Sequence, residues 1–208
     1  MPTVAIIPVK SFALGKQRLA GALSPGARAE LGRALADHVA TVCASSGLVP
    51  LVVTADIEVA EWATRAGFPS LPDPGSGLDD AASAGVDWAA SSGSSWVVLH
   101  SDLPLLGTSD VTRLEEAVSA GRDVLAPSAD GGTSAIGGGD SIRFSFGASS
   151  FHEHLATLRD PVIVARSGLL LDIDSPSDLK AAMTTPRGRW LGEVITRSGA
   201  HRAGHNLY

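Results

Sequence analysis

Residues 96–104 read W-V-V-L-H-S-D-L-P, an apolar run that ends abruptly in Asp102. The run is short and rich in β-branched residues, which is typical of a central strand buried on both faces. A second apolar run, Leu169–Leu171, leads into Asp172 and Asp174, so we predict a strand over residues 169–173. Ligands of an open, mostly parallel α/β sheet bind beyond the carboxyl ends of its strands. We therefore expect both acidic ends to face one crevice, and converging carboxylates favour a hard cation such as magnesium.

The rest of the chain alternates between strand-like and helix-like segments up to residue 127. This alternation predicts an α/β fold with a doubly wound, mostly parallel sheet. The predicted strands cover residues 3–9, 48–54, 68–71, 123–127 and 161–165, and the predicted helices follow Ser24, Asp56, Gly77, Thr108, Ser150 and Ser175. The regularity breaks down over residues 129–139, which contain five glycines. We expect an irregular segment there, either a backbone that approaches a ligand closely or a mobile surface loop.

Composition limits the classes of protein to which the chain can belong. Its 208 residues suit a single domain over residues 1–196, followed by a flexible tail over 197–208. A net charge of -6 with scattered lysines and arginines opposes a nucleic-acid partner. The single cysteine, Cys43, permits no intrachain disulfide and favours a cytoplasmic location. No segment resembles a signal peptide or a membrane span, so we expect no membrane partner.

A basic loop follows the first predicted strand. Lys10, Lys16 and Arg18 lie just beyond its carboxyl end, where cations would suit a polyphosphate. A solvated surface loop explains the same charges, and charge alone does not decide between the two interpretations. The P-loop motif and the G-x-G-x-x-G motif are both missing from the sequence, which argues against those two kinds of phosphate-binding fold.

Serines and histidines offer further candidates. Ser149 and Ser150 precede a predicted helix, so their hydroxyls and free N–H groups could bind an anion, although an ordinary helix cap explains them as well. His152 and His154 suggest a metal pair, but residues two apart do not share a helix face. We therefore set this pair aside and assign His100 to strand packing or to a local hydrogen bond.

An ordered set of short motifs runs through the chain. It comprises I-P-V-K at 7–10 with K-x-R-L at 16–19, P-D-x-G-x-G-L at 72–78, D-L-P-L at 102–105, Gly-Thr at 132–133, F-G-x-x-S at 146–150 and L-D-I-D-x-P-x-D-L at 171–179. Together these motifs resemble the guanylyltransferases of deazaflavin coenzyme biosynthesis, which join GTP to phosphoenolpyruvate or to 2-phospho-L-lactate. The resemblance implies a three-layer sandwich of the nucleotide-diphospho-sugar transferase type and an enzyme that uses Mg²⁺.

The resemblance also implies roles for particular residues. Asp102 and Asp172 would bind magnesium with Asp174 close behind, Lys10, Lys16 and Arg18 would surround the triphosphate, and Thr133, Gly147, Ser149 and Ser150 would hold the acceptor. Lys16 and Arg18 would join the two aspartates in catalysis. The Gly77 loop, with Asp73 and Asp79, would meet the guanine base. Asp79 stands where the family pattern leads us to expect asparagine, but a carboxylate can still accept hydrogen bonds from guanine.

Several alternatives remain open at the level of sequence. Phosphoenolpyruvate is favoured as acceptor because the Ala- and Gly-rich composition resembles that of a high-GC bacterium, which is an association and not a mechanism. The same reaction on 2-phospho-L-lactate or 3-phosphoglycerate is the first alternative. A transferase for a sugar phosphate or a molybdopterin is less favoured because the Gly-rich opening typical of those enzymes is missing. A non-catalytic nucleotide-binding module is the alternative of another class, and the sequence leaves open whether the chain forms a homodimer.

Overall fold

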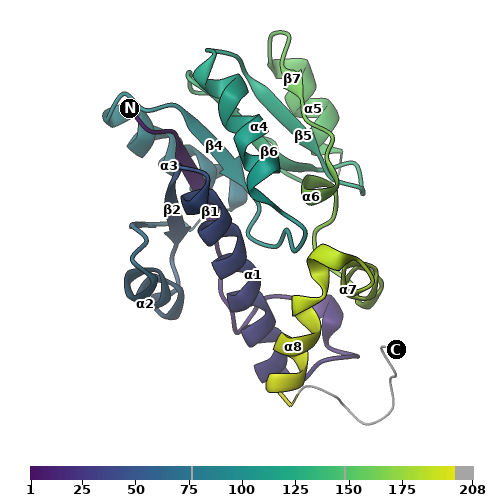
Figure 1. Ribbon diagram of the computed structural model, residues 1–208. Coiled ribbons are helices and arrows are strands. Elements are labelled where there is room, and N and C mark those ends of the chain that lie inside the picture. Colours follow the sequence, from purple (N-terminus) through teal and green to yellow (C-terminus); the bar gives the residue numbers. More distant parts are fainter. Residues whose placement is uncertain (76, 148, 200–208) are drawn as a thin grey trace.

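The computed structural model describes residues 1–75, 77–147 and 149–199. Within these ranges, seven strands form one sheet in the order β3-β2-β1-β4-β6-β5-β7, in which only β6 runs antiparallel to its neighbours (Figure 1). The strands are β1 (Val4–Pro8), β2 (Val49–Thr54), β3 (Ser70–Pro72), β4 (Trp96–Leu99), β5 (Val124–Pro127), β6 (Thr133–Gly138) and β7 (Val162–Ile163). The predicted α/β class with a mostly parallel sheet is therefore confirmed.

Helices cover both faces of the sheet and extend beyond it. They are α1 (Pro25–Ser45), α2 (Ile57–Ala66), α3 (Leu78–Ser91), α4 (Thr108–Ser119), α5 (Ser150–Thr157), α6 (Ser167–Leu170), α7 (Pro176–Met183) and α8 (Trp190–Arg197), with short 3-10 turns η1 (Gln17–Leu19) and η2 (Pro186–Gly188). Figure 1 shows α7 and α8 beside the end of α1 that lies away from the sheet. None of the helices in the described ranges is long and apolar enough to cross a membrane.

The central strands β1 and β4 are buried on both faces, as their apolar sequences predict. Ala5 and Ile7 of β1 join a core with α1, α2 and α4, whereas Val4 and Ile6 join a second core with α3. Alternate residues of a strand point to opposite faces, so the two cores lie on opposite faces of the sheet. The three layers are therefore the sheet and the helices on each of its two faces. A third cluster packs α1 against α7 and α8. Residues 200–208, which make up most of the predicted tail, lie outside the described ranges.

The predicted strand over residues 169–173 is wrong. Residues 167–170 form the short helix α6, and residues 171–174 follow it without regular secondary structure and outside the sheet. One backbone hydrogen bond, from Ile173 N to Asp102 O at 3.2 Å, still ties this segment to the end of β4. Periodicity alone cannot distinguish a short buried strand from a buried helical turn, so the error arose from the apolar run itself.

The expectation of an irregular segment over 129–139 is also wrong, because Thr133–Gly138 forms the fully buried strand β6. Its glycines permit close packing: a Cβ on Gly137 would lie 2.7 Å from the carbonyl oxygen of Trp96 on the neighbouring strand. Since β6 is antiparallel, its first residue, Thr133, lies at the edge where β4 and β5 end. The strand thus brings its amino end to the site described below.

A buried carboxylate connects three segments near this edge. The side chain of Asp110 is 1% exposed and binds Arg166 Nε at 2.6 Å and Arg187 Nη1 at 2.9 Å. It also accepts the backbone N–H of Gly107 at 3.0 Å. Asp110 therefore joins the start of α4 to α6 and η2, and it holds the chain that leads from α6 into Asp172.

Candidate active site

A cleft of about 600 Å³ lies along the carboxyl edge of β1 and β4. Nine of the residues predicted from the sequence line it: Lys10, Lys16, Arg18, Asp102, Thr133, Gly147, Ser150, Asp172 and Asp174. The crevice expected beyond the strand ends is therefore present. A second hollow of about 530 Å³, on α8, contains none of the predicted site residues.

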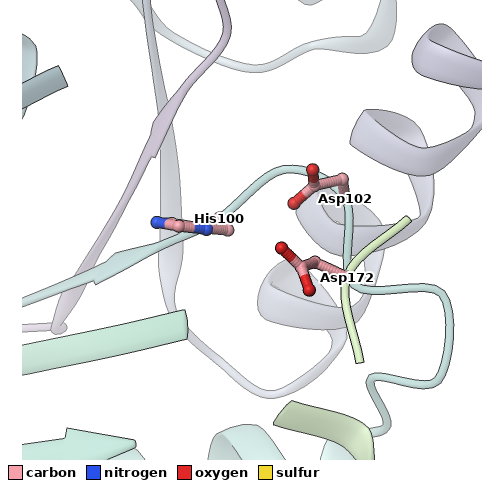
Figure 2. A group of neighbouring side chains, drawn as sticks. All are labelled: His100, Asp102 and Asp172. Atoms are coloured by element: carbon pink, nitrogen blue, oxygen red, sulfur yellow. The ribbon is translucent and has the colours of Figure 1, made fainter. Parts of the chain in front are cut away.

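Three side chains at one end of the cleft could hold a metal ion. One ligand atom from each of His100, Asp102 and Asp172 lies within 4.8 Å of the other two. Figure 2 shows the carboxylates of Asp102 and Asp172 facing each other, with His100 beside them. The Nε2 atom of His100 is buried and has no hydrogen-bond partner among the described residues. From the sequence, His100 was assigned to strand packing or to a local hydrogen bond. Its ring does pack against Phe146, at 5.6 Å between centroids, and its position in this group adds a role that the sequence did not suggest.

Lys16 is the closest cation to the acidic group. Its ammonium forms an ion pair with Asp102 and lies 3.6 Å from Asp174 Oδ1. Burial alone would lower the pKa of Lys16, but the nearby carboxylates, Asp102 foremost and then Asp174 and Asp172, together outweigh burial and raise the pKa. Burial alone would raise the pKa of Asp102, but the nearby Lys16 ammonium helps to hold it below its ordinary value. Both groups are therefore charged near neutral pH.

Asp172 and Asp174 have different surroundings. Burial, and then the nearby charge of Asp102, raises the pKa of Asp172, and a bound cation would oppose this shift by stabilising the ionised form. Asp174 is half-exposed and lies 3.4 Å from Arg18 Nη1 as well as near Lys16. This arrangement agrees with the preference for Asp172 over Asp174 as the direct metal ligand, which stays a prediction.

Because Lys16 competes with any divalent cation for Asp102, Lys16→Gln is expected to bind Mn²⁺ at least about tenfold more tightly than the wild type. The uncharged amide can still donate a hydrogen bond to Asp102 but does not repel the ion. Isothermal titration with Mn²⁺ measures the change. Lys10→Gln is the matched control, since Lys10 lines the same cleft and has no ion pair within the described part of the chain. Weaker Mn²⁺ binding by Lys16→Gln would contradict the competition.

Hydroxyls and a glycine line a further part of the cleft, which adjoins His100 because the His100 ring packs against Phe146 at 5.6 Å between centroids. Thr133 and Ser150 are buried, and Ser150 Oγ donates to Thr133 Oγ1 at 3.3 Å. Gly147 has a φ of 145°, which suits glycine because it has no Cβ. Ser149 caps α5 with a left-handed backbone and does not line the cleft. Three of the four residues predicted to hold the acceptor are thus brought together.

The residues predicted to meet guanine are not among those that line the cleft. Leu78 lines it, but Asp73, Gly77 and Asp79 do not. Asp73 Oδ1 accepts the N–H of Gly75 at 2.8 Å, and Asp79 Oδ1 accepts the N–H of Phe146 at 2.8 Å. Asp79 thus ties the start of α3 to the loop that carries Gly147, and its contact with guanine stays a prediction.

Sequence reasoning missed several polar residues that line the cleft, and among them Ser128 and Asp130 are hydrogen-bonded to each other. The Ser128 hydroxyl bonds to Asp130, and Gly132 N donates to Asp130 Oδ1 at 2.9 Å. These two bonds lower the pKa of Asp130. Both residues directly follow β5, so the pattern that singled out Asp102 after β4 was available here too.

Comparison with known proteins extends the argument from the site to the family. The family model described as "Guanylyl transferase CofC like" matches residues 3–194. The chain is 36% identical over 190 residues to a phosphoenolpyruvate guanylyltransferase of Sphaerobacter thermophilus, covering 86% of this chain and 92% of the relative. It is 35% identical over 203 residues to a 2-phospho-L-lactate guanylyltransferase of Methanothermobacter thermautotrophicus, covering 95% and 91%.

Solved structures with lower identity share the fold. A Desulfovibrio desulfuricans protein described as a candidate nucleotide-diphospho-sugar transferase is 16% identical, with a TM-score of 0.74 over 95% of this chain and 99% of its own. A nucleotidyl transferase from Methanothermobacter thermautotrophicus is 18% identical, with a TM-score of 0.57 over 93% and 99%. The expected nucleotide-diphospho-sugar transferase type of fold is confirmed. By the family match and its two similar relatives, this chain belongs to the CofC-like guanylyltransferase family.

Proposed function

We propose that this guanylyltransferase joins GTP to phosphoenolpyruvate and releases pyrophosphate, as a step in deazaflavin coenzyme biosynthesis. One observation carries the proposal: a single cleft contains a basic and acidic end, with Lys16, Arg18 and Asp102, and a hydroxyl-lined end, with Thr133 and Ser150. The first end suits a triphosphate and its cation, and the second suits a small anionic acceptor. A cytoplasmic location belongs to the same proposal because the single cysteine is a buried free thiol.

The reaction needs positioning more than proton transfer. A phosphate oxygen of the acceptor forms a bond to the α-phosphorus of GTP, while the bond from that phosphorus to the leaving pyrophosphate breaks. A phosphate monoester with a second pKa near ~6 is already largely ionised at neutral pH, so no general base is required. Lys16 and Arg18 offset the charge of the triphosphate, and Thr133, Gly147 and Ser150 orient the acceptor.

The donor set at the acidic end fits a magnesium ion. Asp102 and Asp172 supply the carboxylate oxygens that Mg²⁺ prefers, and these carboxylates face each other. His100 lies close enough to complete the group. When bound, magnesium would neutralise and align the phosphates of GTP. The place of Asp174 between Lys16 and Arg18 suits it to hold these two cations.

2-Phospho-L-lactate is the second candidate acceptor. A relative of that name is 35% identical over most of this chain. The two acceptors differ in planarity and by two hydrogens, which hydroxyls and a glycine need not distinguish. Phosphoenolpyruvate is preferred because several similar relatives carry its name.

Pyrophosphate release tests the proposal. Purified protein with Mg²⁺ and GTP receives phosphoenolpyruvate, 2-phospho-L-lactate or 3-phosphoglycerate in separate reactions, and a coupled assay detects pyrophosphate so that a labile product does not matter. We expect the fastest release with phosphoenolpyruvate. Faster release with another acceptor would reassign the substrate. If none of the three acceptors gives pyrophosphate release although GTP binding is measurable, a different acceptor or a non-catalytic module would be favoured.

A further inference from the structure

A fully buried histidine lies directly behind the hydroxyl-lined end of the cleft. His154 of α5 is 0% exposed, and its Nδ1 atom lies 2.9 Å from Thr133 Oγ1. Its Nε2 atom lies 3.0 Å from the backbone nitrogen of Ser145. The rings of Phe144 and Phe146 pack edge-on against it, at 6.3 and 4.9 Å between centroids. His154 does not line the cleft, so any part that it has in the reaction is indirect.

The surroundings of His154 determine where its proton lies. A backbone N–H can only donate, so Nε2 must accept from Ser145 and cannot carry a hydrogen. The neutral ring therefore carries its hydrogen on Nδ1 and donates it to Thr133. Burial lowers the pKa of His154 despite the nearby charges of Asp79 and Glu153, which agrees with a neutral ring at physiological pH.

This tautomer constrains the hydroxyl of Thr133. Thr133 Oγ1 accepts one hydrogen bond from His154 and a second from Ser150 Oγ. A hydroxyl oxygen has two acceptor sites, and both are then used. The hydrogen of Thr133 must be given to a further acceptor, and both Thr133 and Ser150 line the cleft. The network thus leaves a hydrogen-bond donor for a ligand in the cleft.

We infer that His154 is a positioning residue that fixes the Thr133 hydroxyl as a donor to an anionic oxygen of the acceptor. The inference rests on the proposed function, since it concerns the end of the cleft assigned to the acceptor. A neutral histidine adds no charge to this end, so recognition depends on the direction of the hydroxyl. Loss of His154 should weaken acceptor binding and leave GTP binding unchanged.

Two substitutions of His154 separate positioning from packing. His154→Leu removes both hydrogen bonds of the imidazole ring. The KM for the acceptor is expected to rise about tenfold to a hundredfold, as for loss of a hydrogen bond to a charged group. His154→Gln can donate to Thr133 through its amide nitrogen and accept from Ser145 through its oxygen, so its KM should stay within about threefold of the wild type. The KM for GTP should not change in either variant.

Thr133→Val keeps the shape of the side chain and supplies a second route if His154→Leu does not fold. It should raise the KM for the acceptor by a similar factor. In the double variant with His154→Leu, the two effects should not multiply, because both remove the same donor. Multiplying effects would overturn the inference, as would an acceptor KM for Thr133→Val equal to that of the wild type.

A spectrum of the unliganded protein tests the tautomer without any turnover. In a long-range ¹H–¹⁵N correlation spectrum at pH 7.5, we expect His154 to be neutral with its hydrogen on Nδ1. A hydrogen on Nε2, or a cationic ring, would overturn the inference. If the wild type turns over but His154→Leu and His154→Gln both keep its acceptor KM, His154 has no positioning role and the proposed function stands. If the wild type releases no pyrophosphate with any of the three acceptors, the proposed function fails, and the inference about the acceptor fails with it.

Discussion

Replacing Asp102 by asparagine is expected to lower pyrophosphate release roughly a thousandfold or more. The side chain is only 19% exposed and forms an ion pair with Lys16. It also belongs, with His100 and Asp172, to the group that could bind a cation. Asparagine keeps the shape but removes the charge, so both the cation site and the partner of Lys16 are lost at once. Steady-state rates with GTP, Mg²⁺ and phosphoenolpyruvate measure the loss.

Asp174→Asn is the matched control for this prediction. Asp174 lies in the same cleft, but its side chain is 49% exposed and contacts Lys16 at 3.6 Å and Arg18 at 3.4 Å. Solvent screens these two ion pairs, so each contributes little to the energy of the site. We therefore expect the rate of pyrophosphate release to fall by about tenfold or less. Equal losses in the two variants would show that Asp102 has no special place in the site. The circular dichroism spectrum of each variant should match that of the wild type.

Asp110→Ala is expected to lower the free energy of unfolding by about 3 kcal/mol, at the lower end of the range for a broken buried ion pair. The carboxylate is buried and pairs with both Arg166 and Arg187, whose side chains are 42% and 49% exposed. The half-exposed arginines can be hydrated after the change, which reduces the cost. Loss of the hydrogen bond from the Gly107 N–H adds to the cost in stability. Urea unfolding followed by fluorescence measures the difference.

Glu116→Ala provides a control on the same helix. Glu116 forms an exposed ion pair with Arg113 at 3.3 Å, and loss of such a pair should cost less than about 0.5 kcal/mol. If the two variants lose equal stability, Asp110 does not hold α4, α6 and η2 together. Because Arg166 leads into α6 and then Asp172, Asp110→Ala should also weaken Mn²⁺ binding, whereas Glu116→Ala should not.

The sequence predicted the parts of the fold that depend on local pattern. Strands β1 and β4 are continuous apolar runs, and α7 begins with a serine cap followed by proline at Pro176. Such signals depend only on neighbouring residues. The same reasoning brought Lys16 and Asp102 to one cleft, because β1 and β4 are neighbouring parallel strands whose ends share one edge. Asp172 was also expected there, but it follows the short helix α6 and not a strand.

The errors occurred where contacts distant in sequence decide the structure. Strand β6 contains glycines that would weaken an isolated strand, but the neighbouring strands β4 and β5 pair with it on both sides. α6 forms where Gly168 packs so close to Asp110 that a Cβ would lie 2.0 Å from its carboxylate. The bond between His154 and Thr133 joins residues 21 positions apart. No local pattern in the sequence indicates these contacts.

The reversed direction of β6 has a consequence for how acceptor preference can change. It places Thr133 near the start of a continuous stretch, residues 128–158, that also contains Gly147, Ser150 and His154. The groups assigned to the nucleotide and its cation lie outside this stretch: they precede it in the loop after β1, near the start of α3 and after β4, and Asp172 follows it. Exchange of one uninterrupted piece between relatives can therefore replace the whole acceptor end of the cleft. The guanylyl-transferring machinery would be inherited unchanged, and a new acceptor would require no rearrangement of the chain.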